Sequence, residues 1–510
     1  MPRGREKLPL LIVPGGVRED LNPAAIPDGS LLASQNWLTR RGVGGPRPGY
    51  VQLGSTLAAA DRIMGFGTRG SPSNTTNFVV HTLTAAYSWN GTSFTAITGT
   101  WTATVAADHI RMISYVSGGT NWLLRTTQSN AIDKWDGVAA AFVDAGGTPP
   151  NFRDMCAVGG RVLGVYPLGL EHRVRWNDID DVDVWTSTNF DDLDATPDFL
   201  VGCKPFGPLA AGIYKEDSVW SAVSQVARQP FQFQLIAQVP GPLSPAAIIG
   251  YRGSHFWLAE DSVIYRSDGS SVEPFATGLP VTFRANLDWT NRIQTHAFVL
   301  AEEEPIVMFV YPVIGGTMDR GISVNLVTGA VNAHQFAHSI TASAQYTRTA
   351  TVTWNDLTGT WDGLSATYAS WDSMGSSMPS SNVLGASDGK VHQFGNRAND
   401  DGTAIAWSFT HGWRALAGLG FRFFLDGIVS YWVKLSSTFT VTVGVTVSDS
   451  LGDAETESTD TFDLLTDSEH LETFSNLRGG WIKVRFAGSS AVAGIVHRGA
   501  AILGWRRGLL

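Results

Sequence analysis

The sequence predicts an all-β protein that combines a β-propeller-like domain with a C-terminal antiparallel β-sandwich or jelly-roll-like domain. Three observations lead to this class. The chain has 55 Gly and 23 Pro, and short runs rich in β-branched and aromatic residues lie between these breakers. Tryptophan recurs beside turn signals, as in Trp89-Asn90-Gly91 and Trp135-Asp136-Gly137. The run from Phe439 to Val447 alternates for nine residues, which places its Phe and Val on one face of a strand.

The bulk composition describes a large folded chain with an acidic balance. Its 510 residues suggest roughly two to four domains. The residues are 43% hydrophobic and only 16% charged, which argues against disorder of the whole chain. The net charge of −10 argues against a strong phosphate-binding surface but is compatible with a wall past which DNA slides.

The cysteines and the apolar runs of the sequence indicate the cellular compartment of the protein. Cys156 and Cys203 could form one bridge at most, and buried free thiols are the favoured state. The longest apolar run, Pro305 to Ile314, has the length of a strand, so we expect no transmembrane span. The apolar stretch after Lys7 is short and lacks a cleavage site, so we expect a soluble protein made in a cytoplasm.

The opening segment, residues 1–59, is interrupted throughout by loop signals such as Pro46-Arg47-Pro48-Gly49. Ser30 to Trp37 could make one short helix, with Asp28 near its N-cap. The segment has too little local pattern to fold alone, so we expect it to pack on the other domains.

Residues 60–402 contain the short β-runs expected of a propeller. Trp89 and Trp135 lie 46 residues apart, and Trp135 and Trp185 lie 50 apart, which is close to one four-stranded blade. Five to seven such units fit the sequence. A tandem echo begins at Trp354, Trp361 and Trp371. The spacing of seven between the first two resembles a heptad, but Gly, Thr and Asp fill the positions that a coiled coil would need to be apolar.

Residues 403–510 have longer strands and form the predicted sandwich domain. Phe439 to Val447 is followed by an acidic loop and then by a second alternating strand, Trp481 to Phe486.

No catalytic signature is present in the sequence. A phosphate-binding Gly-rich loop, a Gly-x-Ser-x-Gly elbow and a His-Glu-x-x-His zinc helix are all missing. His334 and His338 lie four residues apart in a β-rich region, where that spacing does not align two zinc ligands. We therefore expect no catalytic residue, no cofactor and no metal.

Two acidic stretches are candidate functional loops. The first could supply oxygen ligands to a calcium ion or a carboxylate pair for glycoside hydrolysis, but a solvated loop pinned by Val184, Trp185 and Phe190 is the favoured interpretation. Their members are Asp178, Asp180, Asp181, Asp183, Asp191, Asp192 and Asp194 in the first, and Asp449, Asp453, Glu455, Glu457 and Asp460 in the second.

Several segments resemble the tail-nozzle proteins of short-tailed bacteriophages, also called tail tubular protein B or packaged-DNA stabilisation proteins. In the opening segment these are Val17 to Pro23, Ile26 to Ser30, Ala33 to Trp37 and Gly44 to Tyr50. Further along they are Val174 to Ile179 with Trp185, the tandem Trp-Asp repeats at 354–372, Trp407 to Gly412, and Phe421 to Phe423.

This resemblance implies a structural virion protein without an active site. Such subunits join as a ring, expected to be a homohexamer, below the portal and adaptor proteins. The ring closes the DNA exit channel, later conducts double-stranded DNA during ejection, and carries tail fibres or a tail-tip plug. The protein would be assembled in the host cytoplasm and reside in the virion. The residues of the two acidic stretches are candidates to face the channel, where their negative charge would repel the DNA from the wall.

Two other functions remain open at this stage. A propeller could act as a virion adhesin that displays loops to a host glycan. It could also be a hydrolase that uses Asp191 and Asp192.

Overall fold

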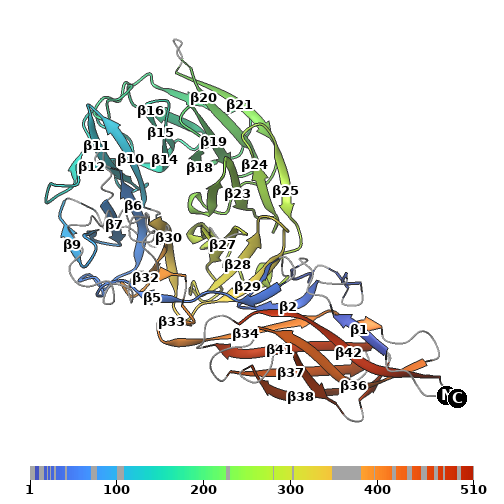
Figure 1. Ribbon diagram of the computed structural model, residues 1–510. Helices are drawn as coiled ribbons and strands as arrows, with labels where there is room; N and C mark the ends of the chain where they lie inside the picture. The colour runs from blue at the N-terminus through green and yellow to red at the C-terminus, as the bar shows by residue number, and fades with distance from the viewer. Residues whose placement is uncertain are drawn as a thin grey trace, which may run out of the picture. The chain divides into compact units, whose positions relative to one another are not determined.

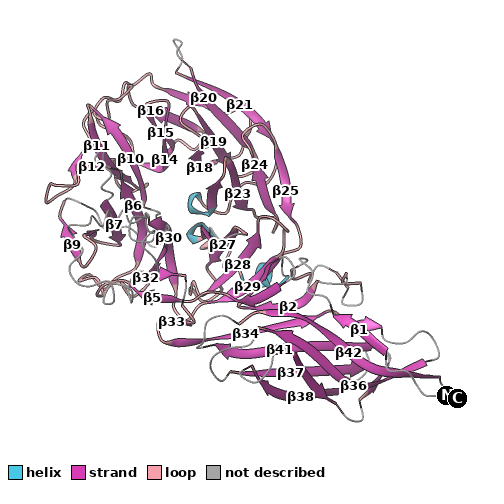
Figure 2. Ribbon diagram, in the orientation of Figure 1, coloured by secondary structure: helices cyan, strands magenta, loops and turns pink. Residues whose placement is uncertain are grey.

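The computed structural model is nearly all β, as the sequence predicts (Figures 1 and 2). Figure 2 shows strands almost throughout, with a few short helical segments. The structure describes residues 6–508 apart from 11–15, 20, 23–24, 28–29, 41–42, 71–76, 100, 102–107, 109, 226–229, 280, 301–303, 347–380, 396, 416–420, 434–438, 449–455, 465–468, 475–476, 480 and 491–494. No helix in this described part is long and apolar enough to cross a membrane.

The chain divides into two compact units. Unit 1 comprises Met1–Val51, Pro242–Ile340 and Gly395–Leu510, and unit 2 comprises Gln52–Gly241 and Thr341–Phe394. The predicted boundaries at residues 59/60 and 402/403 stay predictions.

Unit 2 contains four antiparallel sheets of four strands, each formed by consecutive strands of the chain. This is the arrangement of propeller-like blades. The sheets consist of β6 (Ile63–Arg69), β7 (Asn77–Thr82), β8 (Ala86–Trp89) and β9 (Phe94–Ile97); β10 (Arg111–Ser117), β11 (Thr120–Thr126), β12 (Asp133–Trp135) and β13 (Val143–Asp144); β14 (Phe152–Val158), β15 (Arg161–Pro167), β16 (Arg173–Trp176) and β17 (Phe190–Asp192); and β18 (Leu200–Pro205), β19 (Ala210–Lys215), β20 (Val219–Ser224) and β21 (Phe231–Ala237). Strands β30 (Ile340–Tyr346), β31 (Ser381–Ala386) and β32 (Val391–Phe394) follow one another in a further sheet.

The tryptophan turns that predicted this class are confirmed where the structure describes them. Trp89 ends β8, and Gly91 then takes a φ of 99°, which glycine adopts without a steric cost. Trp135 ends β12, and the Asp136 carboxylate accepts hydrogen bonds from the backbone N–H of Val138 and Ala139. The repeats at Trp354, Trp361 and Trp371 lie outside the described residues.

The sheets of unit 2 pack face to face in chain order. Met64 and Val79 of the first sheet share a buried cluster with Met112 and Leu123 of the second. The other interfaces follow the same pattern: Leu124 packs with Phe152 and Val162, and Leu163 packs with Leu200 and Ile213. The first three sheets each contribute to two of the unit's buried clusters, so the apolar runs of the sequence become the core of the unit.

Unit 1 contains two more four-stranded sheets and three short helices. With the four sheets of unit 2 this gives six four-stranded sheets in the described part of the chain, within the expected five to seven. The elements are β22 (Ile248–Tyr251), β23 (Ser254–Leu258), β24 (Ile264–Ser267) and β25 (Val272–Ala276); β26 (His296–Leu300), β27 (Ile306–Tyr311), β28 (Arg320–Asn325) and β29 (Val331–Gln335); and the helices η1 (Pro245–Ala247), α1 (Val281–Asn286) and η2 (Arg292–Gln294).

The rest of unit 1 is a sandwich of two β-layers, as predicted for the C-terminal region. One layer orders β3 (Trp37–Arg40), β4 (Val43–Pro46), β42 (His497–Gly508), β36 (Phe421–Trp432) and β39 (Glu469–Thr473), with β1 (Glu6–Leu10) beside β42 and β40 (Arg478–Gly479) beside β36. The other layer orders β5 (Tyr50–Gln52), β33 (Asn399–Asp400), β34 (Thr403–His411), β41 (Trp481–Ser490), β37 (Thr440–Ser448) and β38 (Thr456–Asp463), with β2 (Leu31–Gln35) beside β34 and β35 (Arg414–Ala415) beside β41.

The sandwich core depends on the alternation seen in the sequence. Val441, Val443, Val445 and Val447 of β37 are all buried in one cluster. Ile482, Val484 and Phe486 of β41 are buried in the same cluster, and Trp37, Leu425 and Ile502 come from the opposite layer.

The predicted helix from Ser30 to Trp37 is wrong. These residues form β2 and the start of β3, separated by Asn36 at a φ of 53°. Strand β2 pairs with β34, and Trp37 lies fully buried in the sandwich core. Backbone pairing and aromatic burial therefore outweigh the modest helix propensity of the Leu-Leu-Ala sequence. Within unit 1, β1 of the opening segment pairs with β42 and β2 with β34, and the packing of residues 1–59 on other domains stays a prediction.

His411 gives this unit a testable dependence on pH. The side chain is buried at the end of β34, and its ring centroid lies 5.8 Å from that of Phe409 and 6.4 Å from that of Phe486. Burial lowers the pKa of His411 to about 4, below the value of about 6.5 expected in the unfolded chain. The unfolded state therefore binds more protons between these two values, so this contribution is present above pH ~6.5 and is lost as the pH falls toward ~4.

We expect His411→Phe to retain its stability better than the wild type as the pH falls. The difference between the two proteins should approach roughly 3 kcal/mol across this window. Urea unfolding at pH ~7 and at pH ~4.5 measures it. An equal loss of stability in both proteins would show that His411 does not titrate between these states.

Candidate functional site

The first acidic stretch lies between β16 and β17 of unit 2, and we call residues 177–194 the acidic loop. Asp191 and Asp192 belong to β17, and the other acids lie in the connections on either side. Asp180, Asp181 and Asp194 are exposed, whereas the remaining acids of the loop are half-buried.

Two apolar side chains anchor the acidic loop. Val182 and Trp185 are buried in a cluster with Phe152, and the Trp185 indole N–H donates to the Val182 carbonyl at 2.9 Å. The predicted anchoring by Trp185 is thus confirmed. Val184 and Phe190, which the sequence also suggested as anchors, are exposed by 39% and 37%.

Asp183 joins the acidic loop to the preceding sheet. The Lys134 ammonium, on β12, donates to Asp183 Oδ1 at 2.6 Å, and the backbone N–H of Gly146 donates to the same oxygen at 2.7 Å. Partial burial raises the pKa of the Asp183 carboxyl, but these hydrogen bonds outweigh burial and the net pKa is lowered. Asp183 is therefore a charged link between two sheets.

Asp192 forms a bidentate ion pair with Arg173. The two residues are opposite each other in the register of β16 and β17, and Arg173 Nε and Nη2 each donate to one carboxylate oxygen at 2.7 Å. These bonds lower the pKa of Asp192. In contrast, burial first, and then the charges of Asp192 and Asp194, raise the pKa of neighbouring Asp191.

The remaining acids stabilise the loop itself. Asp178 Oδ1 accepts a hydrogen bond from the Asn189 amide at 2.6 Å, and Asp181 Oδ1 accepts one from the backbone N–H of Asp183 at 3.0 Å. The backbone carbonyl of Asp180 accepts from Gly118 N–H of the preceding sheet. Within the described residues, no three ligand atoms of the acidic loop lie close enough together to hold a metal ion. What the arrangement provides is rigid attachment between neighbouring sheets.

The second acidic stretch lies largely outside the described residues, which exclude Asp449, Asp453 and Glu455. Glu457 is exposed on β38, and Arg485 Nη2 lies 3.5 Å from its Oε1. Whether either stretch faces a DNA channel stays a prediction.

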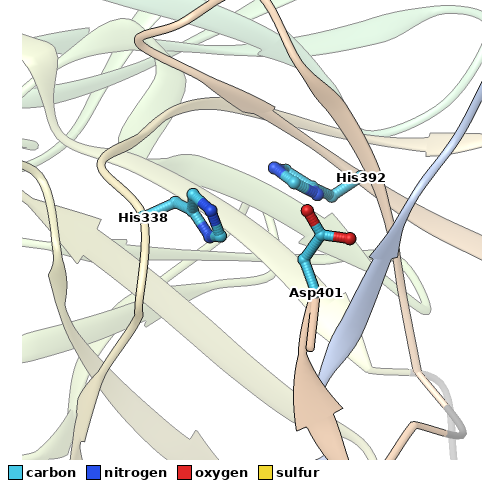
Figure 3. A group of neighbouring side chains, drawn as sticks. All are labelled: His338, His392 and Asp401. Carbon is cyan, nitrogen blue, oxygen red and sulfur yellow. The ribbon is translucent and has the colours of Figure 1, made fainter. Parts of the chain in front are cut away.

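The two histidines spaced by four residues have different partners. His334 Nε2 lies 2.7 Å from Ser323 Oγ, and His338 Nδ1 lies 3.0 Å from the Tyr50 hydroxyl. Figure 3 draws His338 with Asp401, which follows β33 of unit 1, and with His392, which is on β32 of unit 2.

Sequence reasoning missed a buried arginine network in unit 1. All five N–H groups of Arg47 donate: two to the carboxylate of Asp400, and the others to Asn36 Oδ1, the Pro48 carbonyl and the Gln335 carbonyl. The guanidinium also lies over the Phe336 ring, 4.6 Å from its centroid. The sequence predicted only a loop at Pro46-Arg47-Pro48-Gly49, and the partner Asp400 of Arg47 lies too far away in the chain for a local pattern to identify it.

A second buried arginine lies in unit 2. Arg125 donates to the Asp133 carboxylate at 3.0 and 2.7 Å, and its Nη1 lies 2.8 Å from His81 Nε2. Its guanidinium stacks over the rings of Trp101 and Phe142. Burial first, and then the positive charge of Arg125, lower the pKa of His81 to about 3, so the imidazole is neutral at physiological pH. This network holds β7 of one sheet against β11 and β12 of the next.

Comparison with known proteins gives no family assignment. No protein-family model and no curated protein matches the sequence. Among solved structures, the chain is similar to the computationally designed Ika8 protein, with 11% sequence identity and a TM-score of 0.38; the match covers 68% of this chain and 99% of the designed one.

Proposed function

We propose that this chain is a structural virion protein of a bacteriophage tail that assembles into a ring-shaped nozzle below the portal and adaptor. The observation that carries the proposal is the use of charge in the described residues. In unit 2, Lys134 binds Asp183 of the following sheet, and Arg125, which also binds Asp133, contacts His81 of the preceding sheet. In unit 1, Arg47 of the opening segment binds Asp400 on β33. A protein whose function is its shape requires this rigidity.

The resemblance to tail-nozzle proteins supports the same function, because the residues that carry it have structural roles. Asn36 separates β2 from β3, and Trp37 is buried in the sandwich core. Arg47 is the centre of a network in which all of its N–H groups donate hydrogen bonds. These residues fix the path of the opening segment within unit 1. The likeness to the family therefore lies in residues that determine the shape of the subunit.

The ring itself follows from identical rigid subunits that meet through heterologous contacts around an axis. The preferred stoichiometry is six, and DNA would pass through the bore without sequence-specific binding. With a net charge of −10, the subunit gains little from phosphate contacts, and mild repulsion extends roughly 8 Å from the wall at physiological salt.

Native mass spectrometry and sedimentation of the purified chain test this function. We expect a closed assembly of about six subunits, either alone at high concentration or on addition of an adaptor ring. A monomer at every concentration, with and without the adaptor, would contradict the nozzle. A monomer that also binds a defined sugar on a glycan array would instead favour the adhesin that the sequence leaves open.

A further inference from the structure

Strand β21 gives the fourth sheet of unit 2 an open edge. It is the last strand of that sheet and pairs with β20 on one side. Across residues 6–508, apart from the gaps named above, no backbone group bonds to its other side. Phe231 and Phe233 hold the strand in place, because their rings pack on Trp176 of the neighbouring sheet, with centroids 5.3 and 6.1 Å away. A fixed strand with unpaired backbone groups is a template for one more strand.

The last strands of the other four-stranded sheets are protected against such pairing. In unit 2, β9 has four residues, β13 has two and β17 has three, and both β13 and β17 carry aspartate. In unit 1, β25 contains Glu273 and Pro274. The opening segment covers β29, whose carbonyls accept hydrogen bonds from the backbone N–H of Val17 and Asn36. Short length, charge, proline and cover are the usual ways in which proteins block a sheet edge.

Strand β21 has none of these protections. Its sequence, Phe-Gln-Phe-Gln-Leu-Ile-Ala, runs for seven residues without a charge or a proline. Gln232 and Gln234, which alternate with the two phenylalanines, are exposed. Because the chain carries a net charge of −10, two copies repel each other least where neither presents a charge. The strand therefore fits an identical strand, whose glutamines it would face without like-charge repulsion.

We propose that β21 pairs antiparallel with the β21 of a second copy of this chain, so that two four-stranded sheets become one continuous sheet. Two identical strands meet about a two-fold axis, whereas the closure of a ring requires heterologous contacts. The contact therefore goes beyond the proposed nozzle and joins two subunits, or two rings of subunits. A single pair of strands buries little surface, so the pairing should form only as the protein concentration rises.

Charges introduced into β21 test this pairing. Sedimentation of the wild type over a range of concentrations should show an assembly whose mass doubles. We expect Gln232→Lys/Gln234→Lys to lower the association constant for this doubling at least about tenfold, because the lysines of the two copies would face one another. Gln232→Glu/Gln234→Glu should do the same. An equal mixture of the two variants sets lysine against glutamate and should double again, which also shows that both variants fold.

The matched control is Thr95→Lys/Ala96→Lys, which adds the same charge at two exposed positions of β9. It should leave the association constant unchanged. Hydrogen exchange locates the contact, since the amides of residues 231–237 should exchange more slowly at high concentration than at low concentration. If both charged variants double as the wild type does, or if their mixture stays dissociated while its circular dichroism matches that of the wild type, the pairing is wrong.

Two further outcomes separate this inference from the nozzle and from another partner. A wild type that forms a closed ring, but whose mass never doubles, overturns the pairing and leaves the nozzle intact. A lysine variant of β21 that still doubles, but no longer binds an adaptor ring that the wild type binds, would assign the open edge to the adaptor and overturn the pairing of two copies.

Discussion

Arg47→Met is expected to lower the free energy of unfolding of unit 1 by about 3–5 kcal/mol, because it leaves the buried Asp400 carboxylate without its cation. The side chains of Arg47 and Asp400 are only 0% and 4% exposed. The substitution also removes the donors to Asn36 and to the carbonyls of Pro48 and Gln335. Urea unfolding followed by tryptophan fluorescence measures the loss, and the exposed substitution Arg252→Met is the control.

The double variant Arg47→Met/Asp400→Leu shows where this cost arises. If most of the lost free energy of unfolding comes from the unpaired Asp400 carboxylate, removal of both charges should restore part of the stability. Apolar replacement of a complete buried ion pair is often close to neutral. Strictly additive losses in the two single variants and the double variant would contradict a coupled pair.

Trp37→Ala is expected to cost a similar amount, about 3–5 kcal/mol, because it opens a cavity at the centre of the sandwich. The Trp37 indole is fully buried, and its ring centroid lies 5.0 Å from Trp407 and 4.4 Å from Phe409. Gly44 lies against the indole, where a Cβ atom would collide with it.

Leu471→Ala is the control for this cavity, since Leu471 is 53% exposed on β39. It should change the free energy of unfolding by no more than about 0.5 kcal/mol. The Trp37 variant tests whether the opening segment is an integral part of the sandwich. If it unfolds with the same midpoint as the wild type, the segment contributes nothing to the stability of that core.

The sequence predicted the elements that depend on local pattern. Val441 to Val447 could be read as one buried face because side chains alternate along a strand regardless of what lies beyond it. The turns after Trp89 and Trp135 were equally readable, since Gly91 tolerates a positive φ and the Asp136 carboxylate accepts hydrogen bonds from the backbone N–H groups that follow it.

What the sequence did not predict depends on contacts between distant residues. Ser30 to Trp37 has the composition of a short helix, and only its pairing with β34 makes it extended. The partner of Arg47 lies 353 residues away in the chain, so no local spacing could identify it. In the acidic loop the sequence revealed the charges, but the ion pairs with Lys134 and Arg173 depend on how sheets and strands are placed.

Electron microscopy of the purified chain, alone and together with an adaptor ring, tests whether this β-rich subunit is built to form a conduit. We predict class averages of a closed ring with rotational symmetry and an open centre wide enough for a DNA duplex. Averages that contain only separate single subunits under both conditions would contradict that function.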